Sequence, residues 1–429
     1  MKSRSNLIRL MLFIGLLFFL SCGKTITNPI NTTPTKNSKS SQENPYLILI
    51  SLDGFRWDYV EKYKPPQLST FIENGVKAES LIPSYPTKTF PNHYTIATGL
   101  YPDRHGILGN NFYSHDKKVT YNIRDREMVE DGSFYHGSPI WIHAAKTGMV
   151  TASYYFVGTE ANIQGLYPTF YYKFDENVKN EVRVDQAIKW LKMPKEMRPH
   201  LITMYFADLD KTGHRFGPNN DEEIKKTLFK LDTILGDLFK GIHETKLPVN
   251  IIIVSDHGML EVPVENYIPI ELLENDEMFL TVNNGSIVNI HPKEDNLTDS
   301  ILQFLRNKEK NFKVYLTGKT PHFEYIPKNI NWGAIQVVAD DGYYFSDVRS
   351  IGLRKVSARK VFGQHGFDPN LKEMHGIFYA NGPAFNKGYI SSPIKNIHIY
   401  PLMCQILGLE IPTDIDGDIK KIESILKLE

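Results

Sequence analysis

Three long apolar runs dominate the pattern of hydrophobic and polar positions along the chain. They cover residues 46–53, 201–210 and 249–257, and an acidic residue followed shortly by glycine marks the end of each run. Continuous apolar runs of this length are typical of central strands that are buried on both faces of a parallel sheet. In open α/β sheets, ligands bind beyond the carboxyl ends of the strands. The pattern therefore predicts that three strands deliver carboxylates to one edge of the sheet.

Helical periodicity separates these runs. Apolar residues recur at helical spacing over residues 182–193 and 222–242, as expected for amphipathic helices. Residues 259–362 instead contain short strand-like pieces, which indicate a small subdomain inserted into the main domain. We therefore expect an α/β fold with a central, mostly parallel sheet flanked by helices, in one main domain over residues 45–429.

The N-terminus is predicted to be an export signal. Three basic residues, Lys2, Arg4 and Arg9, precede an apolar run over residues 10–20. This run is shorter than the ~20 apolar residues that a membrane-spanning helix needs. It ends at a small residue followed by Cys22, which resembles a bacterial lipobox, although Phe19 stands where leucine is usual.

The lipobox resemblance implies a signal peptide over residues 1–22, with Cys22 lipidated as the first mature residue. Residues 23–44 are rich in Ser, Thr, Asn, Pro and Lys and are predicted to form a flexible tether. We expect an exported protein that is anchored to the cell envelope by lipid. The alternatives are an ordinary cleaved signal peptide and a short membrane anchor.

Composition excludes several classes of protein. Lysine plus arginine equals aspartate plus glutamate, at 49 each, so there is no electrostatic case for nucleic-acid binding. The only two cysteines, Cys22 and Cys404, do not form a disulfide framework. Hydrophobic residues make up 41% of the chain, which is enough to build a large core.

Acidic and histidine side chains gather at the predicted strand ends and in one further glycine-rich loop. They are Asp53, Asp210, His214, Asp256, His257 and His365. Zinc takes histidine nitrogen and carboxylate oxygen, commonly with four ligands. These six groups suit zinc, but they do not complete two four-coordinate ions without a further ligand, water or substrate.

Residues 86–110 change the interpretation. They read Pro-Thr-Lys-Thr-Phe-Pro-Asn-His-Tyr-Thr-Ile-Ala-Thr-Gly-Leu-Tyr-Pro-Asp-Arg-His-Gly-Ile-Leu-Gly-Asn. This string closely resembles the nucleophile region of the nucleotide pyrophosphatase/phosphodiesterase family, within the alkaline phosphatase superfamily. Four other blocks resemble that family in the same order, at residues 52–56, 210–218, 254–259 and 363–368. The resemblance covers residues 45–410 and implies an alkaline-phosphatase-like fold.

The family pattern implies two zinc ions and a threonine nucleophile. One zinc would be held by Asp210, His214 and His365. The other would be held by Asp53, Asp256, His257 and the hydroxyl of Thr89. The resemblance implies that Thr89 attacks phosphorus and forms a covalent intermediate, because a zinc-bound hydroxyl loses its proton near neutral pH. The domain over residues 45–429 would then be a catalytic phosphodiesterase domain.

Other matched positions concern the substrate. Asn110 and the backbone N–H of Phe90 match the family's donors to the phosphoryl oxygen, as in an oxyanion hole. Phe90, Tyr171 and Tyr205 match aromatic positions that stack a nucleobase. Lys88, beside the nucleophile, is expected to be exposed to solvent. Asp208 is two residues before Asp210 and would point the same way on a strand.

Four further residues match no metal position and are expected to be structural: His93, Asp103, His105 and His143. Nucleotide diesters and pyrophosphates are the favoured substrates. The alternatives are a lysophospholipid or choline-headgroup phosphodiesterase, a phosphate monoesterase and, from another class, a ligand-binding lipoprotein without catalysis. All seven matched ligand and nucleophile positions are intact, which favours an enzyme.

Overall fold

A nine-stranded sheet forms the centre of the protein. The computed structural model describes residues 30–31 and 36–427, so the predicted signal peptide and Cys22 lie outside the described residues. The strand order is β1-β8-β7-β9-β2-β10-β19-β3-β20. In that order the strands are Ile30–Asn31, Phe170–Tyr172, Thr151–Tyr154, Leu201–Phe206, Tyr46–Leu52, Val249–Val254, Phe378–Asn381, Val76–Ala78 and Tyr389–Ser391.

The three apolar runs are neighbours in this sheet, with β2 between β9 and β10. Ile48 of β2 lies beside Ile202 of β9 and beside Ile251 of β10, and both pairings are parallel. The β7, β8, β9, β2 and β10 ladder is parallel throughout, while β19 runs antiparallel to β10 and to β3. The prediction of a large, mostly parallel sheet is therefore confirmed.

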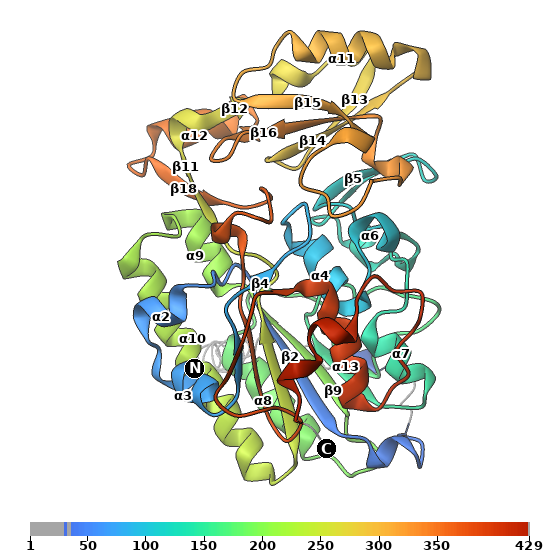
Figure 1. Ribbon diagram of the computed structural model, residues 1–429, viewed down its shortest axis with the longest axis vertical. Helices are drawn as coiled ribbons and strands as arrows, with labels where there is room; N and C mark the ends of the chain where they lie inside the picture. Colours follow the sequence, from blue (N-terminus) through green and yellow to red (C-terminus); the bar gives the residue numbers. More distant parts are fainter. Residues whose placement is uncertain (1–29, 32–35, 428–429) are drawn as a thin grey trace, which may run out of the picture.

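Alternate side chains of β2 enter two different hydrophobic cores, because successive residues of a strand point to opposite faces. Ile48 and Ile50 pack in one core with α3, α8 and α10, whereas Leu47 and Leu49 pack in the other with α4, α7 and α13 (Figure 1). These helices are Pro66–Glu73, Asn180–Leu191, Asp221–Thr245, Thr89–Thr98, Ile140–Lys146 and Ile399–Leu407, respectively. The sheet is thus covered by helices on both faces.

The two helices predicted from periodicity are α8 and α10, with ends within three residues of the expected ones. The Asn220 side chain accepts a hydrogen bond from the Glu223 N–H at 3.1 Å and caps the start of α10. Acidic residues fill the first turn of α10, where they complement the helix dipole. The buried stripe of α10 includes the predicted Ile224, Leu228 and Leu231.

A second sheet of four strands has its own hydrophobic core and lies apart from the large sheet (Figure 1). Its order is β13-β14-β16-β15, and α11 packs on it. The bounds are Phe279–Asn283, Ile287–Pro292, Ile335–Ala339, Phe312–Leu316 and, for α11, Thr298–Arg306. The antiparallel pair β11 (Leu260–Pro263) and β18 (Val361–Gln364) lies where the chain leaves and re-enters the main domain. The exact limits of the predicted subdomain, 259 and 362, stay a prediction.

The folded part begins earlier than the predicted residue 45. Asn37 is buried, its N–H donates to the Glu196 carbonyl at 2.7 Å, and its amide donates to the carbonyls of Lys195 and Arg198. Residues 30–31 pair with β8. Residues 37–44 thus pack on the domain, in contrast to the flexible tether expected there, because the side chains of Asn37, Ser41 and Asn44 donate to backbone carbonyls of the domain. Within the described part of the chain, no helix is both long and apolar enough to cross a membrane.

Candidate active site

The site lies at the carboxyl ends of the central strands. Asp53 directly follows β2, and Asp256 and His257 follow β10 after a single residue. The strand from residue 201 is shorter than expected, because β9 ends at Phe206 and α9 (Asp208–Phe216) begins two residues later. The predicted gathering of carboxylates at one sheet edge is thus reached through two loops and one helix.

Helix α9 sets the direction of three acidic and histidine side chains. Asp210 and His214 lie one turn apart on α9, and their Oδ1 and Nε2 atoms are 3.3 Å apart. The expectation that Asp208 points the same way as Asp210 is wrong, because successive helical residues fan around the axis by about 100°. The Asp208 carboxylate instead accepts a hydrogen bond from the Asn180 amide at 2.8 Å.

Thr89 is the first residue of α4 and is half-buried at the mouth of the site. Its Oγ1 is 3.3 Å from Nε2 of His257. A helix N-terminus carries partial positive charge and free N–H groups, which favours an anion at this point. His365 follows β18, and its ring stacks on His257 with centroids 3.7 Å apart.

The seven predicted ligand positions converge in space. Nε2 of His257 lies 3.1 Å from Asp256 Oδ2 and 3.5 Å from Asp53 Oδ1. Nε2 of His365 lies 3.9 Å from Asp210 Oδ1, the same oxygen that faces His214. Ligand atoms of Asp210, His257 and His365 also lie within 4.8 Å of one another, so His257 stands between the two predicted sets of residues, whose types bind divalent metals.

The three candidate ligand histidines share one orientation. Each Nδ1 lies 2.8 Å from a backbone carbonyl, that of Gly363 for His214, Gly258 for His257 and Thr87 for His365. A carbonyl only accepts, so Nδ1 carries the proton and Nε2 keeps a free lone pair. Such outer contacts fix the tautomer and aim of metal-binding histidines. All three Nε2 atoms face the carboxylates.

His93 also lies near the carboxylates, 3.4 Å from Asp256 Oδ2, and could be grouped with Asp53 and Asp256 as a ligand. Its ring nitrogens are engaged, however. Nδ1 donates to the Thr89 carbonyl at 2.8 Å, and Nε2 lies 2.7 Å from the Ser51 hydroxyl. With its proton on Nδ1 and its lone pair facing Ser51, His93 braces the first turn of α4.

The carboxylates leave three buried oxygens without a hydrogen-bond donor among the described residues: Asp53 Oδ1, Asp210 Oδ1 and Asp256 Oδ2. Burying an unpaired carboxylate oxygen is costly. Burial, with Asp256 and Asp210 nearby, raises the pKa of Asp53 well above its usual range. This donor set therefore fits bound divalent metal ions.

The expectation that the Lys88 side chain is exposed to solvent is wrong. It is 3% exposed, and its Nζ donates to the His365 carbonyl at 2.7 Å and to the Tyr344 hydroxyl at 2.9 Å. Burial lowers the pKa of Lys88 to about 7. The pocket that buries the ammonium is formed by residues more than 250 positions away in sequence, so the local pattern did not reveal it.

The two predicted phosphoryl donors contact each other. The Phe90 N–H donates to Asn110 Oδ1 at 3.1 Å, which fixes the side-chain amide of Asn110. Because that oxygen accepts, the NH₂ group of Asn110 is the end left to serve as a donor. Asn110 also lines the open cleft beside the site.

The aromatic residues behave differently from one another. Tyr205 donates its hydroxyl to Asp53 Oδ2 at 2.6 Å, so it holds a candidate ligand in place as well as presenting a ring. Tyr171 is 3% exposed and stacks on Tyr167 at 5.0 Å. Phe174, three residues later, is 38% exposed and lies 6.4 Å from Tyr205. The family resemblance implied Tyr171 as a stacking residue, whereas the ring of Phe174 lies beside Tyr205.

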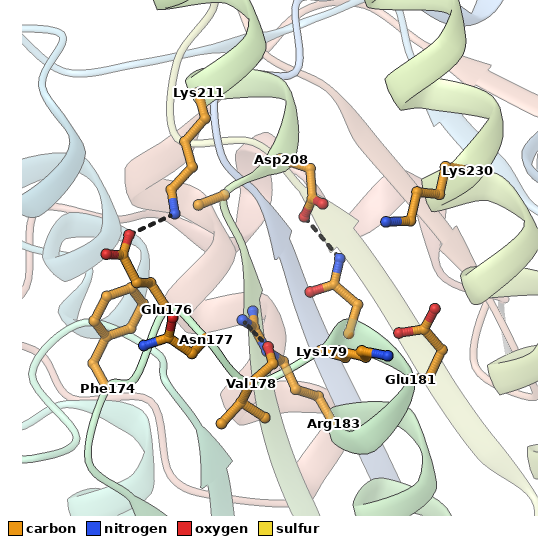
Figure 2. Close-up of a pocket in the computed structure, with 12 residues that line it drawn as sticks. Phe174, Glu176, Asn177, Val178, Lys179, Glu181, Arg183, Asp208, Lys211 and Lys230 are labelled. Atoms are coloured by element: carbon orange, nitrogen blue, oxygen red, sulfur yellow. Dashed lines mark hydrogen bonds and ion pairs between the residues drawn. The ribbon is translucent and has the colours of Figure 1, made fainter. Parts of the chain in front are cut away.

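Hollows lie at the site and beside it. Phe174 stands at one end of a pocket of about 310 Å³ that also includes Arg183, Asp208 and Lys211 (Figure 2). A larger cleft of about 630 Å³ is lined by Lys88, Asn110, His214 and His365, together with residues of the second sheet. Asp210 and His214 also line a hollow of about 580 Å³ together with Arg354, so the candidate ligands are reached from the side of the segment that carries the second sheet, whereas the pocket beside Phe174 contains none of them.

The remaining residues expected to be structural are engaged in packing contacts. Asp103 accepts hydrogen bonds from the Lys328 N–H and from the Trp332 indole, and so joins the main domain to the segment that carries the second sheet. Nε2 of His105 lies 3.0 Å from the Thr95 hydroxyl, and Nε2 of His143 lies 2.8 Å from the Glu410 carbonyl.

The chain belongs to the type I phosphodiesterase/nucleotide pyrophosphatase family, whose model matches residues 47–368. It is 35% identical over 399 residues to venom phosphodiesterase CdcPDE of Crotalus durissus collilineatus, covering 90% of this chain and 47% of the relative. It is 31% identical over 397 residues to bis(5'-adenosyl)-triphosphatase enpp4 of Xenopus laevis, covering 92% and 84%.

Solved structures agree with this assignment. Murine ectonucleotide pyrophosphatase/phosphodiesterase 5 matches with a TM-score of 0.81 and 30% identity, over 89% of this chain and 100% of that one. An inactive threonine-to-alanine variant of the same murine protein, in complex with AMP, also has a TM-score of 0.81, with 29% identity over the same shares of the two chains. The chain spans about half the length of the venom phosphodiesterases that it matches.

Gly54 permits the close approach of Asp210 to Asp53. Its φ is +65°, and a Cβ there would lie 2.7 Å from the Asp210 Cα. We expect Gly54→Ala to displace α9 and lower the bound metal per chain by at least half, with activity lost in parallel. Gly165→Ala is the matched control, since φ is +79° but no heavy atom lies within 4 Å.

In both variants the alanine has a left-handed backbone conformation, which costs ~1–2 kcal/mol. The two variants therefore differ only in the steric clash with Asp210. Metal content measured by atomic emission, together with thermal unfolding, tests this expectation. Wild-type metal content in Gly54→Ala would contradict it.

Proposed function

We propose that this protein hydrolyses phosphodiester or pyrophosphate bonds of nucleotides through a covalent intermediate on Thr89. The observation that carries the proposal is the shared aim of three histidine Nε2 atoms at three unpaired carboxylate oxygens, with Thr89 Oγ1 3.3 Å from one of those nitrogens. Family membership and the AMP complex of the murine relative support the same class of reaction.

We infer two zinc ions, one held by Asp210, His214 and His365 and the other by Asp53, Asp256, His257 and Thr89. When bound, such ions polarise phosphoryl oxygens and lower the pKa of a coordinated hydroxyl. The protein fixes the ligand geometry through the Nδ1–H bonds described above and through Tyr205, which holds Asp53.

The chain's own groups suit an attack by Thr89 on phosphorus. Thr89 Oγ1 forms the new bond to phosphorus while the leaving group departs on the opposite side, and water later cleaves the phosphothreonine. The NH₂ of Asn110 is left to donate to a non-bridging oxygen, and the positive end of the α4 dipole favours the negative charge that develops there; the Phe90 N–H would join them only by exchanging its bond to Asn110 Oδ1.

A nucleotide is favoured over the alternative substrates by the aromatic side of the site. Phe90, Tyr205 and Phe174 offer apolar ring surface on which a base can stack, and this serves a diester better than it serves a phosphate monoester. A choline phosphodiester and an aryl phosphate monoester remain the test substrates for the two enzymatic alternatives. Lack of turnover on all three would favour the non-catalytic lipoprotein.

Thr89→Ala tests the nucleophile. We expect kcat to fall by at least ~10³, on the scale of removing a covalent nucleophile, while the fold is retained. Steady-state hydrolysis of an aryl ester of a nucleoside monophosphate provides the rate, and circular dichroism provides the fold control. Thr87→Ala is no substitute control, because that buried hydroxyl links distant segments, donating to the Phe367 carbonyl and accepting from the Gly366 N–H. Thr70→Ala is suitable, because Thr70 is exposed and bonds only within its own helix, to the Pro66 carbonyl. Wild-type turnover in Thr89→Ala would exclude this mechanism.

Phe174→Ala and Tyr171→Ala separate the two candidate stacking residues. We expect Phe174→Ala to weaken nucleotide substrates by ~1–3 kcal/mol in kcat/KM, the scale of base–aromatic stacking. The same variant should affect a methyl aryl phosphodiester far less, because that substrate has no base. Tyr171→Ala should lower stability and leave the ratio of the two substrates unchanged, since its ring packs on Tyr167. The reverse pattern would restore the assignment made from the sequence.

We also infer export and a lipid anchor at Cys22, from the lipobox-like end of the apolar run. One acyl-linked cysteine explains how a signal too short to span a bilayer holds the mature chain at a membrane. Cys22→Ser should move the protein from the membrane fraction to the soluble fraction, as measured by fractionation and immunoblotting. An unprocessed Cys22→Ser chain that stays membrane-bound would instead indicate a short membrane anchor.

A further inference from the structure

The larger cleft beside the site has one wall from each sheet. Lys88, Asn110 and the loop that follows β6 (Val119–Asn122) form one wall, and the other comes from the second sheet and from α12 (Val348–Val356). His214 and His365 lie at its inner end, which places one predicted metal group at the bottom of the cleft.

Positive charge predominates in the lining of this cleft. Its cationic residues are Lys88, Arg124 and Arg354, against the single carboxylate of Asp347. That carboxylate is engaged, because it caps α12 by accepting from the Ser350 N–H at 2.8 Å. Within residues 36–427, neither Arg124 nor Arg354 has a carboxylate within ion-pair distance. The guanidinium charges are therefore available to a ligand.

Arg354 is held in a defined position. Its guanidinium lies 4.6 Å from the ring centroid of Tyr267 and 5.6 Å from that of Phe362, and it donates to the Ser346 hydroxyl at 3.3 Å. Aromatic faces orient an arginine without neutralising its charge. Arg124, in contrast, is exposed on the opposite wall. Its backbone N–H donates to Asn122 Oδ1, which fixes the turn after β6.

The cationic cleft reaches the site on the side of His214 and His365. Thr89 Oγ1 instead lies 3.3 Å from Nε2 of His257, which belongs to the other predicted metal group. A substrate attacked by Thr89 would therefore direct the group beyond its phosphorus toward the cleft. In-line displacement requires this opposite placement of the leaving group.

We propose that Arg354 and Arg124 are specificity-determining residues that bind an anionic, phosphate-bearing leaving group. The proposal rests on the proposed function. The bond from the attacked phosphorus to its bridging oxygen breaks, and the leaving phosphate chain departs with the electron pair. Thr89 releases its hydroxyl proton to solvent as its oxygen bonds phosphorus, and water later supplies hydroxyl to phosphorus and a proton to the threonine oxygen. Negative charge thus grows where the two guanidinium groups lie, which favours nucleoside triphosphates and dinucleoside polyphosphates.

The test compares ATP with an aryl ester of a nucleoside monophosphate, whose leaving group carries no phosphate. We expect Arg354→Gln and Arg124→Gln each to lower kcat/KM for ATP by ~10–100-fold, the scale of charge-assisted hydrogen bonds. The loss on the aryl ester should stay below ~3-fold, and Arg354→Lys should recover part of the ATP activity. Arg359→Gln is the matched control, because Arg359 is exposed, rests on Phe216 and lies outside the cleft.

Binding of inorganic pyrophosphate to the metal-loaded Thr89→Ala protein gives a readout without turnover. Calorimetry should show affinity lowered ~10–100-fold when Arg354→Gln is added, and unchanged affinity when Arg359→Gln is added. Equal losses on ATP and aryl ester, or unchanged pyrophosphate binding, would overturn the proposal. A wild-type protein that hydrolyses neither nucleotide substrate would instead contradict the proposed function itself.

Discussion

The arrangement of the whole site depends on three carboxylates that are held close together away from water. Asp53, Asp210 and Asp256 each have a buried oxygen that accepts no hydrogen bond from the described residues. Like charges at such distances repel, and protein burial weakens their hydration further. Cations bound between them, assisted by histidine lone pairs, would relieve both costs. The folded scaffold therefore keeps these residues in a state that metal ions complete.

The parallel sheet makes this clustering possible at low cost. Strands β2, β9 and β10 are adjacent and end at the same edge, so Asp53 and Asp256 need no long loops to meet. The Asp210 N–H donates to the Asp53 carbonyl at 3.1 Å, which fastens α9 to the end of β2. Gly54 leaves room for that bond, since any side chain would meet the Asp210 backbone. Backbone contacts thus place the carboxylates before any metal binds.

Local pattern revealed the parts of the fold and site that are encoded over short distances. The apolar runs predicted β2, β9 and β10, and the 3.6-residue stripe predicted α10, because burial on a strand or helix face repeats with a fixed period. The end of β9 was missed, since Asp208 and Asp210 suit a strand end and a helix start equally well. The motifs identified the candidate ligands. They did not identify which ring nitrogen of each histidine faces the carboxylates, because a distant carbonyl fixes it: Nδ1 of His365 donates to the Thr87 carbonyl, 278 residues away.

The sequence did not predict the exposure of residues whose neighbours come from distant segments of the chain. The ammonium of Lys88 is buried by Tyr344 and His365, and the ring beside Tyr205 belongs to Phe174 rather than Tyr171. Both cases share a cause: side-chain exposure is a tertiary property. The candidate catalytic residues and the residues proposed to select the leaving group come from different segments of the chain. The ligands and Thr89 come from the main domain, whereas Arg354 and Tyr344 come from the segment that includes the second sheet. We therefore expect changes in that segment to alter which leaving group is accepted without disturbing the carboxylates proposed to hold the metal.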